Sequence, residues 1–146
     1  MGLTLLDASV VIGFLDASDR HHQGSTVAIR EALANGDELA LPLVAYAEVL
    51  VGALLNNGPK GRALVDDVLA ALPARVIEAS VEVGAGAAEL RAKHRSLKLP
   101  DAFVLATAKT AGATRIITAD RGWPKEMTAI QHLVAQDPSS HAASQD

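Results

Sequence analysis

Short apolar runs alternate with longer segments of helical periodicity along most of the chain. The apolar runs predict strands at residues 3–6, 38–41, 75–77 and 115–118, and a last edge strand at 128–134 with Ile130 as its most buried residue. Helical spacing of apolar side chains predicts helices at 10–15, 23–35, 43–55, 60–71, 81–92 and 100–111. Strands that alternate with helices indicate an α/β fold with a mostly parallel sheet and right-handed crossovers.

Local signals mark several ends of the predicted helices. Ser9 and Ser80 are of the type that accepts a backbone hydrogen bond at a helix N-terminus. Pro100 suits the first position of a helix, and Gly112 suits the position just past its end. The Asn-Asn-Gly-Pro stretch at 56–59 predicts a turn.

The composition is that of one globular domain. The 146 residues are 49% apolar and 21% charged, which is sufficient for one buried core. Few apolar residues follow Ala135, so we expect a folded domain at 1–134 and a disordered tail at 135–146. No apolar run is long enough to span a membrane and no basic flank precedes the first one, so we expect a cytoplasmic protein without membrane attachment.

Charge and cysteine content narrow the possible chemistry. The chain has no cysteine, which excludes disulfides, thiol catalysis and zinc–cysteine sites. Its formal net charge of −4 argues against a protein that holds nucleic acid by bulk charge alone. An enzyme that reaches phosphates through metal ions is compatible with that charge.

Two acidic residues directly follow predicted strands. Asp7 ends the first apolar run, and Asp120 comes two residues after the strand at 115–118. The carboxyl ends of strands in an open parallel sheet are where ligands bind, which favours a functional role for both acids. The alternative is that each acid only turns the chain, as aspartate often does.

Two further acids lie on predicted helices. Glu48 has only non-polar neighbours at the helical positions i−4, i−3, i+3 and i+4, and a carboxylate on such a stripe is costly to bury without a partner. The alternative is a Glu48 at the edge of the stripe with its head in water. Asp101 falls in the first turn after Pro100, where the helix dipole already favours a negative charge without any chemistry.

In a parallel sheet these four acids can meet at one edge, although they are far apart in sequence. Carboxylates gathered in this way raise one another's pKa, so a cluster of them calls for a counter-ion. Oxygen ligands without histidine or cysteine favour Mg²⁺, with Mn²⁺ as a substitute. A metal held by carboxylates is suited to the hydrolysis of phosphodiester bonds.

The order and surroundings of the acids resemble those of a PIN domain, and most of all the VapC toxins of bacterial toxin–antitoxin pairs. The resemblance spans roughly residues 3–133. It depends on Asp7 with Ser9, on Glu48 in its apolar helix, and on two motifs, Leu-Pro-Asp-Ala at 99–102 and Thr-Ala-Asp at 118–120. Two departures are Ser9, where the family often has asparagine, and Trp123, because an aromatic residue commonly follows the fourth acid sooner.

The resemblance implies a fold, an activity and partners. The fold is a Rossmann-like, three-layer αβα sandwich, and the activity is that of a Mg²⁺-dependent ribonuclease that acts as a toxin. The partners are a cognate antitoxin, the RNA substrate and a second copy of the chain in a homodimer. By position, the metal-binding acids are Asp7, Glu48, Asp101 and Asp120, and the supporting hydroxyls are those of Ser9 and Thr118.

Aromatic residues are too few for recognition of single-stranded RNA by stacking, so we expect recognition of backbone shape with contacts from Arg95, Lys98 and Arg121. We interpret His21 and His22 as loop residues and not as metal ligands or a base.

Four other classes of protein compete with the ribonuclease interpretation. A phosphatase of the haloacid dehalogenase type needs a second aspartate at position 9, and a receiver domain needs a lysine after a late strand. A DNA or flap nuclease usually has a longer chain. A catalytically weak adaptor with the same fold would not require all four acids.

Overall fold

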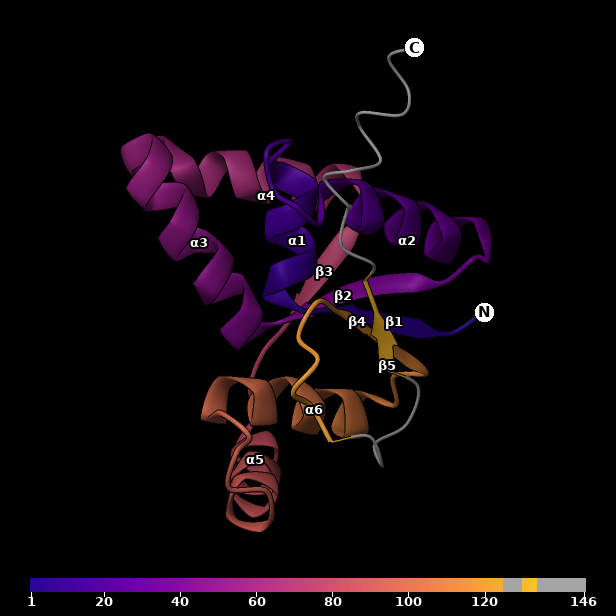
Figure 1. Cartoon of the computed structure of the whole chain (residues 1–146), viewed down its shortest axis with the longest axis vertical. Helices are drawn as coiled ribbons and strands as arrows, with labels where there is room; N and C mark the ends of the chain where they lie inside the picture. The colour runs from indigo at the N-terminus through magenta and orange to yellow at the C-terminus, as the bar shows by residue number, and fades with distance from the viewer. Residues whose placement is uncertain (125–129, 134–146) are drawn as a thin grey trace.

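A parallel five-stranded sheet forms the centre of the protein, seen here in a computed structural model that describes residues 1–124 and 130–133. Its strands are β1 (Leu3–Leu6), β2 (Glu38–Pro42), β3 (Ala74–Ile77), β4 (Arg115–Thr118) and β5 (Ile130–His132). They lie in the order β3-β2-β1-β4-β5, and every neighbouring pair is parallel (Figure 1). The α/β fold with a parallel sheet is therefore confirmed.

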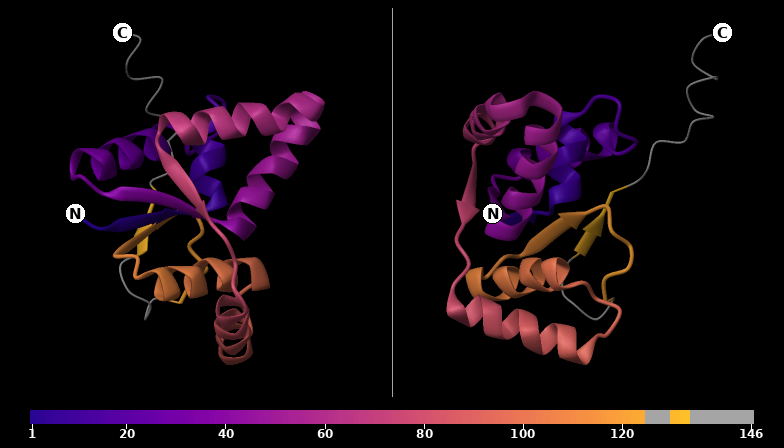
Figure 2. Two further views of the ribbon diagram at one scale, coloured as in Figure 1. Left: turned by 180° about the vertical axis from the view of Figure 1, so that it is seen from behind. Right: turned by 90° about the vertical axis from the view of Figure 1, so that its left-hand side faces the viewer.

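Helices cover both faces of the sheet, so the three-layer αβα sandwich is confirmed as well. One face carries α1 (Ala8–Leu15), α2 (His22–Ala34), α3 (Leu43–Asn57) and α4 (Gly61–Ala71), and the short 3₁₀ helix η1 (Gly58–Lys60) joins the last two. The other face carries α5 (Val81–Lys93) and α6 (Leu99–Ala111) (Figure 2). Helices α3 and α4 meet at a corner that projects away from the sheet.

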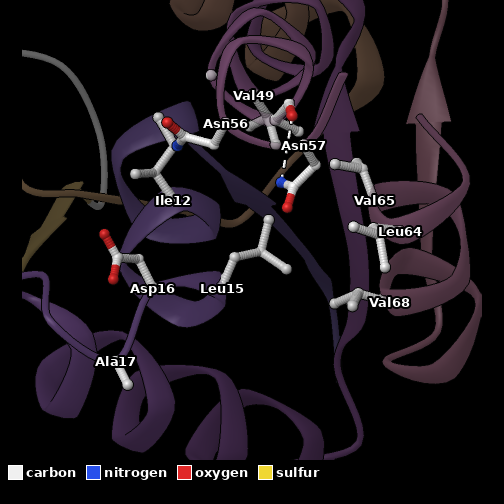
Figure 3. A pocket seen from close by; sticks show the side chains of 12 residues that line it. Ile12, Leu15, Asp16, Ala17, Val49, Asn56, Asn57, Leu64, Val65 and Val68 are labelled. Atoms are coloured by element: carbon white, nitrogen blue, oxygen red, sulfur yellow. Dashed lines mark hydrogen bonds between the residues drawn. The ribbon is translucent and has the colours of Figure 1, made fainter. Parts of the chain in front are cut away.

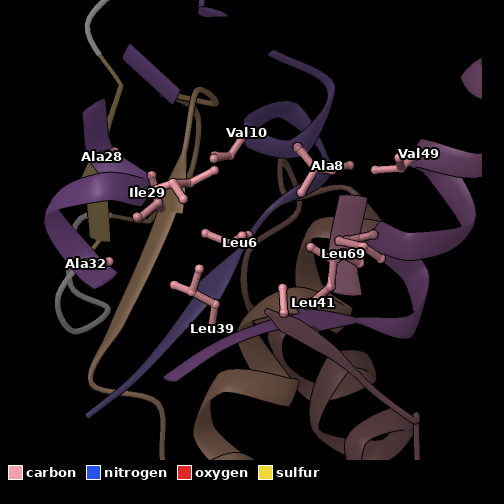
Figure 4. Packing of buried hydrophobic residues seen from close by; sticks show 14 of the residues in the cluster. Leu6, Ala8, Val10, Ala28, Ile29, Ala32, Leu39, Leu41, Val49 and Leu69 are labelled. Carbon is pink, nitrogen blue, oxygen red and sulfur yellow. The ribbon is translucent and has the colours of Figure 1, made fainter. Parts of the chain in front are cut away.

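The pleat of β1 divides the core in two. Successive side chains of a strand point to opposite faces, so Leu6 packs toward α1–α4 while Leu5 packs toward α5 and α6. Both leucines are fully buried, as expected for a strand in the middle of a doubly covered sheet. Figure 4 shows the first of these cores, where Leu6 and Leu41 face Ala8 and Leu69.

Several helix ends differ from the sequence prediction. Helix α1 begins at Ala8, so Asp7 and not Ser9 occupies the N-cap position. Helix α3 continues through the predicted turn as far as Asn57, and η1 makes the reversal instead. Ser80 does cap α5, since its hydroxyl accepts a 3.1 Å hydrogen bond from the backbone N–H of Val83.

The last strand is at the edge of the sheet, as predicted, and residues 128, 129 and 134 of its predicted range lie outside the described residues. It spans Ile130–His132, and Ile130 is only half-buried, whereas Leu133, just beyond it, is 3% exposed. The predicted tail at 135–146 lies outside the described residues. Within the part of the chain that is described, no helix combines the length and the apolar character needed to cross a membrane.

Candidate metal centre

Asp7 lies at the carboxyl end of β1, the central strand. Its backbone N–H donates to the Ile117 carbonyl of β4 at 3.1 Å, so the ladder between the two strands continues to the acid itself. The side chain is 7% exposed. The central position of β1 therefore buries this acid at the edge where the other strands also end.

Two hydroxyl groups hold the Asp7 carboxyl. Thr118 Oγ1 donates to Asp7 Oδ2 at 2.8 Å, and Ser9 Oγ donates to the same oxygen at 3.1 Å. Burial raises the pKa of Asp7, these hydrogen bonds lower it, and the charge of Asp120 raises it. The net direction is upward. Burial therefore outweighs the hydroxyl donors, and the ionised carboxylate is held at an electrostatic cost.

The hydroxyls also tie Asp7 to the loop that carries Asp120. The backbone N–H of Ala119 donates to Ser9 Oγ at 3.1 Å, and that of Asp120 donates to Thr118 Oγ1 at 3.0 Å. Asp120 Oδ1 in turn accepts the backbone N–H of Gly122 at 2.8 Å. This chain of hydrogen bonds fixes the first and fourth acids relative to each other, as a supporting role for Ser9 and Thr118 requires.

Glu48 is on the outward part of α3, with its side chain exposed. Partial burial and the nearby charge of Asp7 nevertheless raise the pKa of Glu48, while Lys98 opposes the shift. The acid is thus at the edge of its apolar stripe, and it remains within electrostatic reach of Asp7.

Of the four acids, Asp101 has the largest resolved shift in pKa. Burial in the first turn of α6 raises its pKa, and the charges of Asp7, Asp120 and Glu48 raise it further, to about 6. Each of the other three acids therefore acts on Asp101. The other three predicted acids therefore all lie within electrostatic range of Asp101.

The donor set fits a hard divalent cation. It consists of carboxylates, and their mutual repulsion is what a bound cation relieves. Across residues 1–124 and 130–133, no three acidic or histidine side chains are gathered at the spacing of metal ligands. The four acids are therefore in electrostatic contact without forming a closed ligand cage.

The predicted RNA-contacting residues differ in their relation to the acids. Lys98 is exposed at the N-cap of α6, and its charge lowers the pKa of Glu48, so it lies beside the acids. Arg121 donates to the Leu133 carbonyl at 3.2 Å, and Arg95 is exposed between α5 and α6.

The loop histidines have local partners. His22 Nδ1 is 2.8 Å from the Gly13 carbonyl oxygen, and His21 Nδ1 is 3.7 Å from Asp19 Oδ1. His21 lies in the loop as predicted, whereas His22 is the first residue of α2 and not a loop residue.

Sequence reasoning gave no specific role to Trp123, although this residue contacts the site. The Trp123 side chain opposes part of the rise in the pKa of Asp101, although its indole N–H makes no hydrogen bond of normal geometry within the described residues. The only sequence signal for it is the position of this tryptophan, three residues after Asp120.

A groove lies between α1, α3 and α4. Its volume is about 490 Å³, and Figure 3 shows Ile12, Leu15, Val49 and Leu64 among the residues that line it. None of the four acids is among the lining residues. The groove is therefore a surface separate from the acidic site, and its lining is mostly apolar.

Comparison with known proteins identifies the family. The PIN domain model matches residues 4–126, so the chain belongs to the PIN domain family. No curated protein matches the chain.

Solved structures of similar fold come from toxin–antitoxin complexes. A toxin–antitoxin complex from Klebsiella pneumoniae is 25% identical, with a TM-score of 0.66 over 87% of this chain and 94% of that chain. VapBC2 from Rickettsia felis, bound to a promoter DNA fragment, is 14% identical, with a TM-score of 0.72 over 90% and 99%. VapC20 from Mycobacterium tuberculosis, a toxin that cleaves the sarcin–ricin loop, is 15% identical, with a TM-score of 0.62 over 77% and 86%.

Proposed function

We propose that the protein is a cytoplasmic, Mg²⁺-dependent endoribonuclease that acts as the toxin of a toxin–antitoxin pair. The observation that carries the proposal is the convergence of Asp7, Glu48, Asp101 and Asp120 on one edge of the sheet, where the other three acids raise the pKa of Asp101. Membership of the PIN domain family and the likeness to toxin–antitoxin complexes support the same activity.

The four acids are the proposed ligands of the ion. When bound, Mg²⁺ would activate a water molecule, orient the scissile phosphate and neutralise developing negative charge. Ser9 and Thr118 hold Oδ2 of Asp7 in place, which keeps the most buried ligand in one orientation. The same hydroxyls connect Asp7 to the backbone that carries Asp120. These hydrogen bonds therefore order two of the four acids before any ion binds.

Incubation with total cellular RNA, with and without EDTA, tests the activity. Wild-type protein with Mg²⁺ or Mn²⁺ should cut the RNA, and EDTA should abolish cutting. Asp7→Asn should lower the rate by orders of magnitude while the circular dichroism spectrum stays unchanged. The matched control is His21→Ala, which should retain activity. Cleavage by Asp7→Asn at the wild-type rate would contradict the assignment.

Recognition of the substrate is proposed to depend on charge and backbone shape. Trp123 is 4% exposed, so the only tryptophan is not available for stacking on a base. Arg95 and Lys98 are exposed basic residues on the α5–α6 side of the molecule, and Lys98 lies beside the acids. We assign both residues, together with Arg121, to contacts with RNA phosphates.

The groove between α1, α3 and α4 is the proposed docking site of the antitoxin. Its lining includes the exposed apolar residues Ile12, Leu15 and Leu64, which suit the apolar side chains of a partner segment. A basic side chain elsewhere on the same partner would suit the four acids and would block substrate phosphates. The solved neighbours supply the class of partner, because they are toxin–antitoxin complexes.

Co-purification with the product of the neighbouring gene tests this docking site. Wild-type protein should bind that product tightly and lose its ribonuclease activity. Leu64→Asp should keep the activity and weaken the binding, whereas Val27→Asp, at an exposed position of α2 outside the groove, should bind as the wild type does. Equal binding by the two variants would place the partner elsewhere.

Self-association is the last part of the proposal. Large apolar side chains remain exposed near the end of α3, namely Val51 at 58%, Leu54 at 44% and Leu55 at 82%. Exposed apolar surface of this kind commonly marks a protein interface. Light scattering should give the mass of a dimer or of a larger assembly, and a mass of one chain at all concentrations would contradict this part.

A further inference from the structure

Trp123 is packed beneath the acidic site. It is 4% exposed, and it belongs to the core between the sheet and α6, together with Ala102, Leu105 and Ile116. Ala102 directly follows Asp101 in the first turn of α6. The indole ring is therefore held by the same helix that presents one of the four acids.

The indole N–H of Trp123 is a buried donor without an ordinary partner. Within the described part of the chain, Nε1 makes no hydrogen bond of normal geometry. A buried donor that is left unpaired costs free energy, so such a group is expected to face an acceptor. The nearest candidate acceptor is the carboxyl of Asp101, because Trp123 opposes part of the rise in the pKa of that acid. The two residues are therefore neighbours in the fold, although no hydrogen bond of normal geometry joins them within the described residues.

We propose that Trp123 is a positioning residue, whose buried indole N–H orients the carboxyl of Asp101 for the divalent ion. This inference rests on the proposed metal-dependent function. An indole N–H only donates, so it can hold one carboxylate oxygen without itself becoming a metal ligand. It also does not titrate, so it holds the carboxylate equally well at any pH at which the protein is folded. Groups that hydrogen-bond to a metal ligand, without binding the metal themselves, fix the orientation of that ligand.

Intrinsic fluorescence gives a direct test, because Trp123 is the only tryptophan in the chain. Titration of the wild-type protein with Mn²⁺ should change the tryptophan emission with saturation. Asp101→Asn should lose this change, and Asp67→Asn, at an exposed acid of α4, should retain it. Mn²⁺ binding in calorimetry with no change in emission would overturn the inference while leaving the metal site intact.

A second test measures the affinity of the site itself. Trp123→Phe removes the N–H and keeps most of the ring, so Mn²⁺ binding measured by calorimetry should weaken about tenfold, the lower end for outer partners of metal ligands. Ile116→Val trims the same core without touching Asp101, so it should lower the melting temperature and leave the affinity unchanged.

The outcomes separate this inference from the proposed function. Unaltered Mn²⁺ affinity in Trp123→Phe would overturn the role of Trp123 alone. An absence of any Mn²⁺ binding by the wild-type protein would overturn the proposed function, and this inference with it. If Trp123→Phe does not fold, the emission of the wild-type and Asp101→Asn proteins decides the question.

Discussion

Asp101 couples the stability of the protein to pH. Its pKa rises from 3.8 to about 6 on folding, so the folded state binds this proton more tightly than the unfolded chain does. Protonation of Asp101 therefore stabilises the folded state. This contribution is complete below pH 3.8 and is lost as the pH rises through about 6. Asp101→Asn should accordingly raise the melting temperature at pH 7 in EDTA, and it should change it little at pH 4.

The control for this prediction is Asp67→Asn, which removes an exposed acid of α4. Thermal melts of the three proteins at pH 4 and pH 7 are sufficient. A melting temperature of Asp101→Asn that falls below that of the wild type at pH 7 would show that the acid stabilises the metal-free fold, contrary to this account.

Thr118 links two of the acids, and its hydroxyl is both donor and acceptor. Thr118→Val removes the 2.8 Å bond to Asp7 Oδ2 and leaves the N–H of Asp120 without its acceptor. The expected loss of folding free energy is about 1–3 kcal/mol, the usual cost of leaving a buried polar group unpaired. RNA cleavage should also fall, because Asp7 loses one of its two hydroxyl donors.

Thr107→Val is the matched control for Thr118→Val. Thr107 is also buried, but its hydroxyl donates only to the Phe103 carbonyl in the preceding turn of α6. Chemical denaturation of both variants should show the smaller loss for Thr107→Val, and cleavage by that variant should be unchanged. Equal losses in stability and activity would mean that the link through Thr118 has no special role.

At the scale of elements, the junction of α3 and α4 depends on a glycine. A Cβ at Gly61 would lie 2.5 Å from the backbone carbon and oxygen of Ala53, so the two helices could not approach as closely. Gly61→Ala should therefore destabilise the protein by about 1–3 kcal/mol, as overpacking does. Gly84→Ala in α5 should instead stabilise it by up to about 1 kcal/mol, because nothing lies within 4 Å of the new methyl group.

Denaturant unfolding curves of the two alanine variants test this contrast. Gly61→Ala should also widen the groove that α3 and α4 line, and so should weaken the binding of the proposed antitoxin, while Gly84→Ala should leave it unchanged. A stability of Gly61→Ala equal to that of the wild type would mean that the helices can separate without cost.

The elements themselves were largely predictable from hydrophobic periodicity. All five strands and six helices are near their predicted positions, because apolar spacing reports which faces are buried. The ends were less predictable. Helix α3 continues past the Asn-Asn-Gly signal as far as Asn57, and α1 starts at Ala8 because Asp7 has the extended backbone of an N-cap residue. Helix propensity is a weak signal at the ends of helices, so packing determines which residue is the last or the first.

Part of the candidate site was also predictable from the positions of the strands. Asp7 and Asp120 directly follow strands, and parallel strands end at one edge, so the sequence pattern was enough to bring them together. The double hydrogen bond on Asp7 Oδ2 and the contact between Trp123 and Asp101 were not predictable. They depend on side-chain distances across the fold, on which periodicity carries no information.

At the scale of the whole molecule, the charged acids oppose folding, and the proposed cation would relieve that opposition. Burial and mutual repulsion raise the pKa values of Asp7, Glu48 and Asp101. A divalent ion that binds only the folded state adds about 2.7 kcal/mol of stability at a hundredfold excess over its Kd. The melting temperature of the wild-type protein should therefore rise with Mg²⁺ or Mn²⁺ at pH 7.

The double variant Glu48→Gln, Asp101→Asn should weaken the dependence of the melting temperature on Mg²⁺. In EDTA it should melt above the wild type, because two of the repelling charges are gone, and added Mg²⁺ should raise its melting temperature much less. The two melting curves should therefore cross as Mg²⁺ increases, which neither a general effect of salt nor a simple loss of packing would produce. Equal shifts of wild type and variant would mean that ions act elsewhere on the protein, and that these acids are not the site.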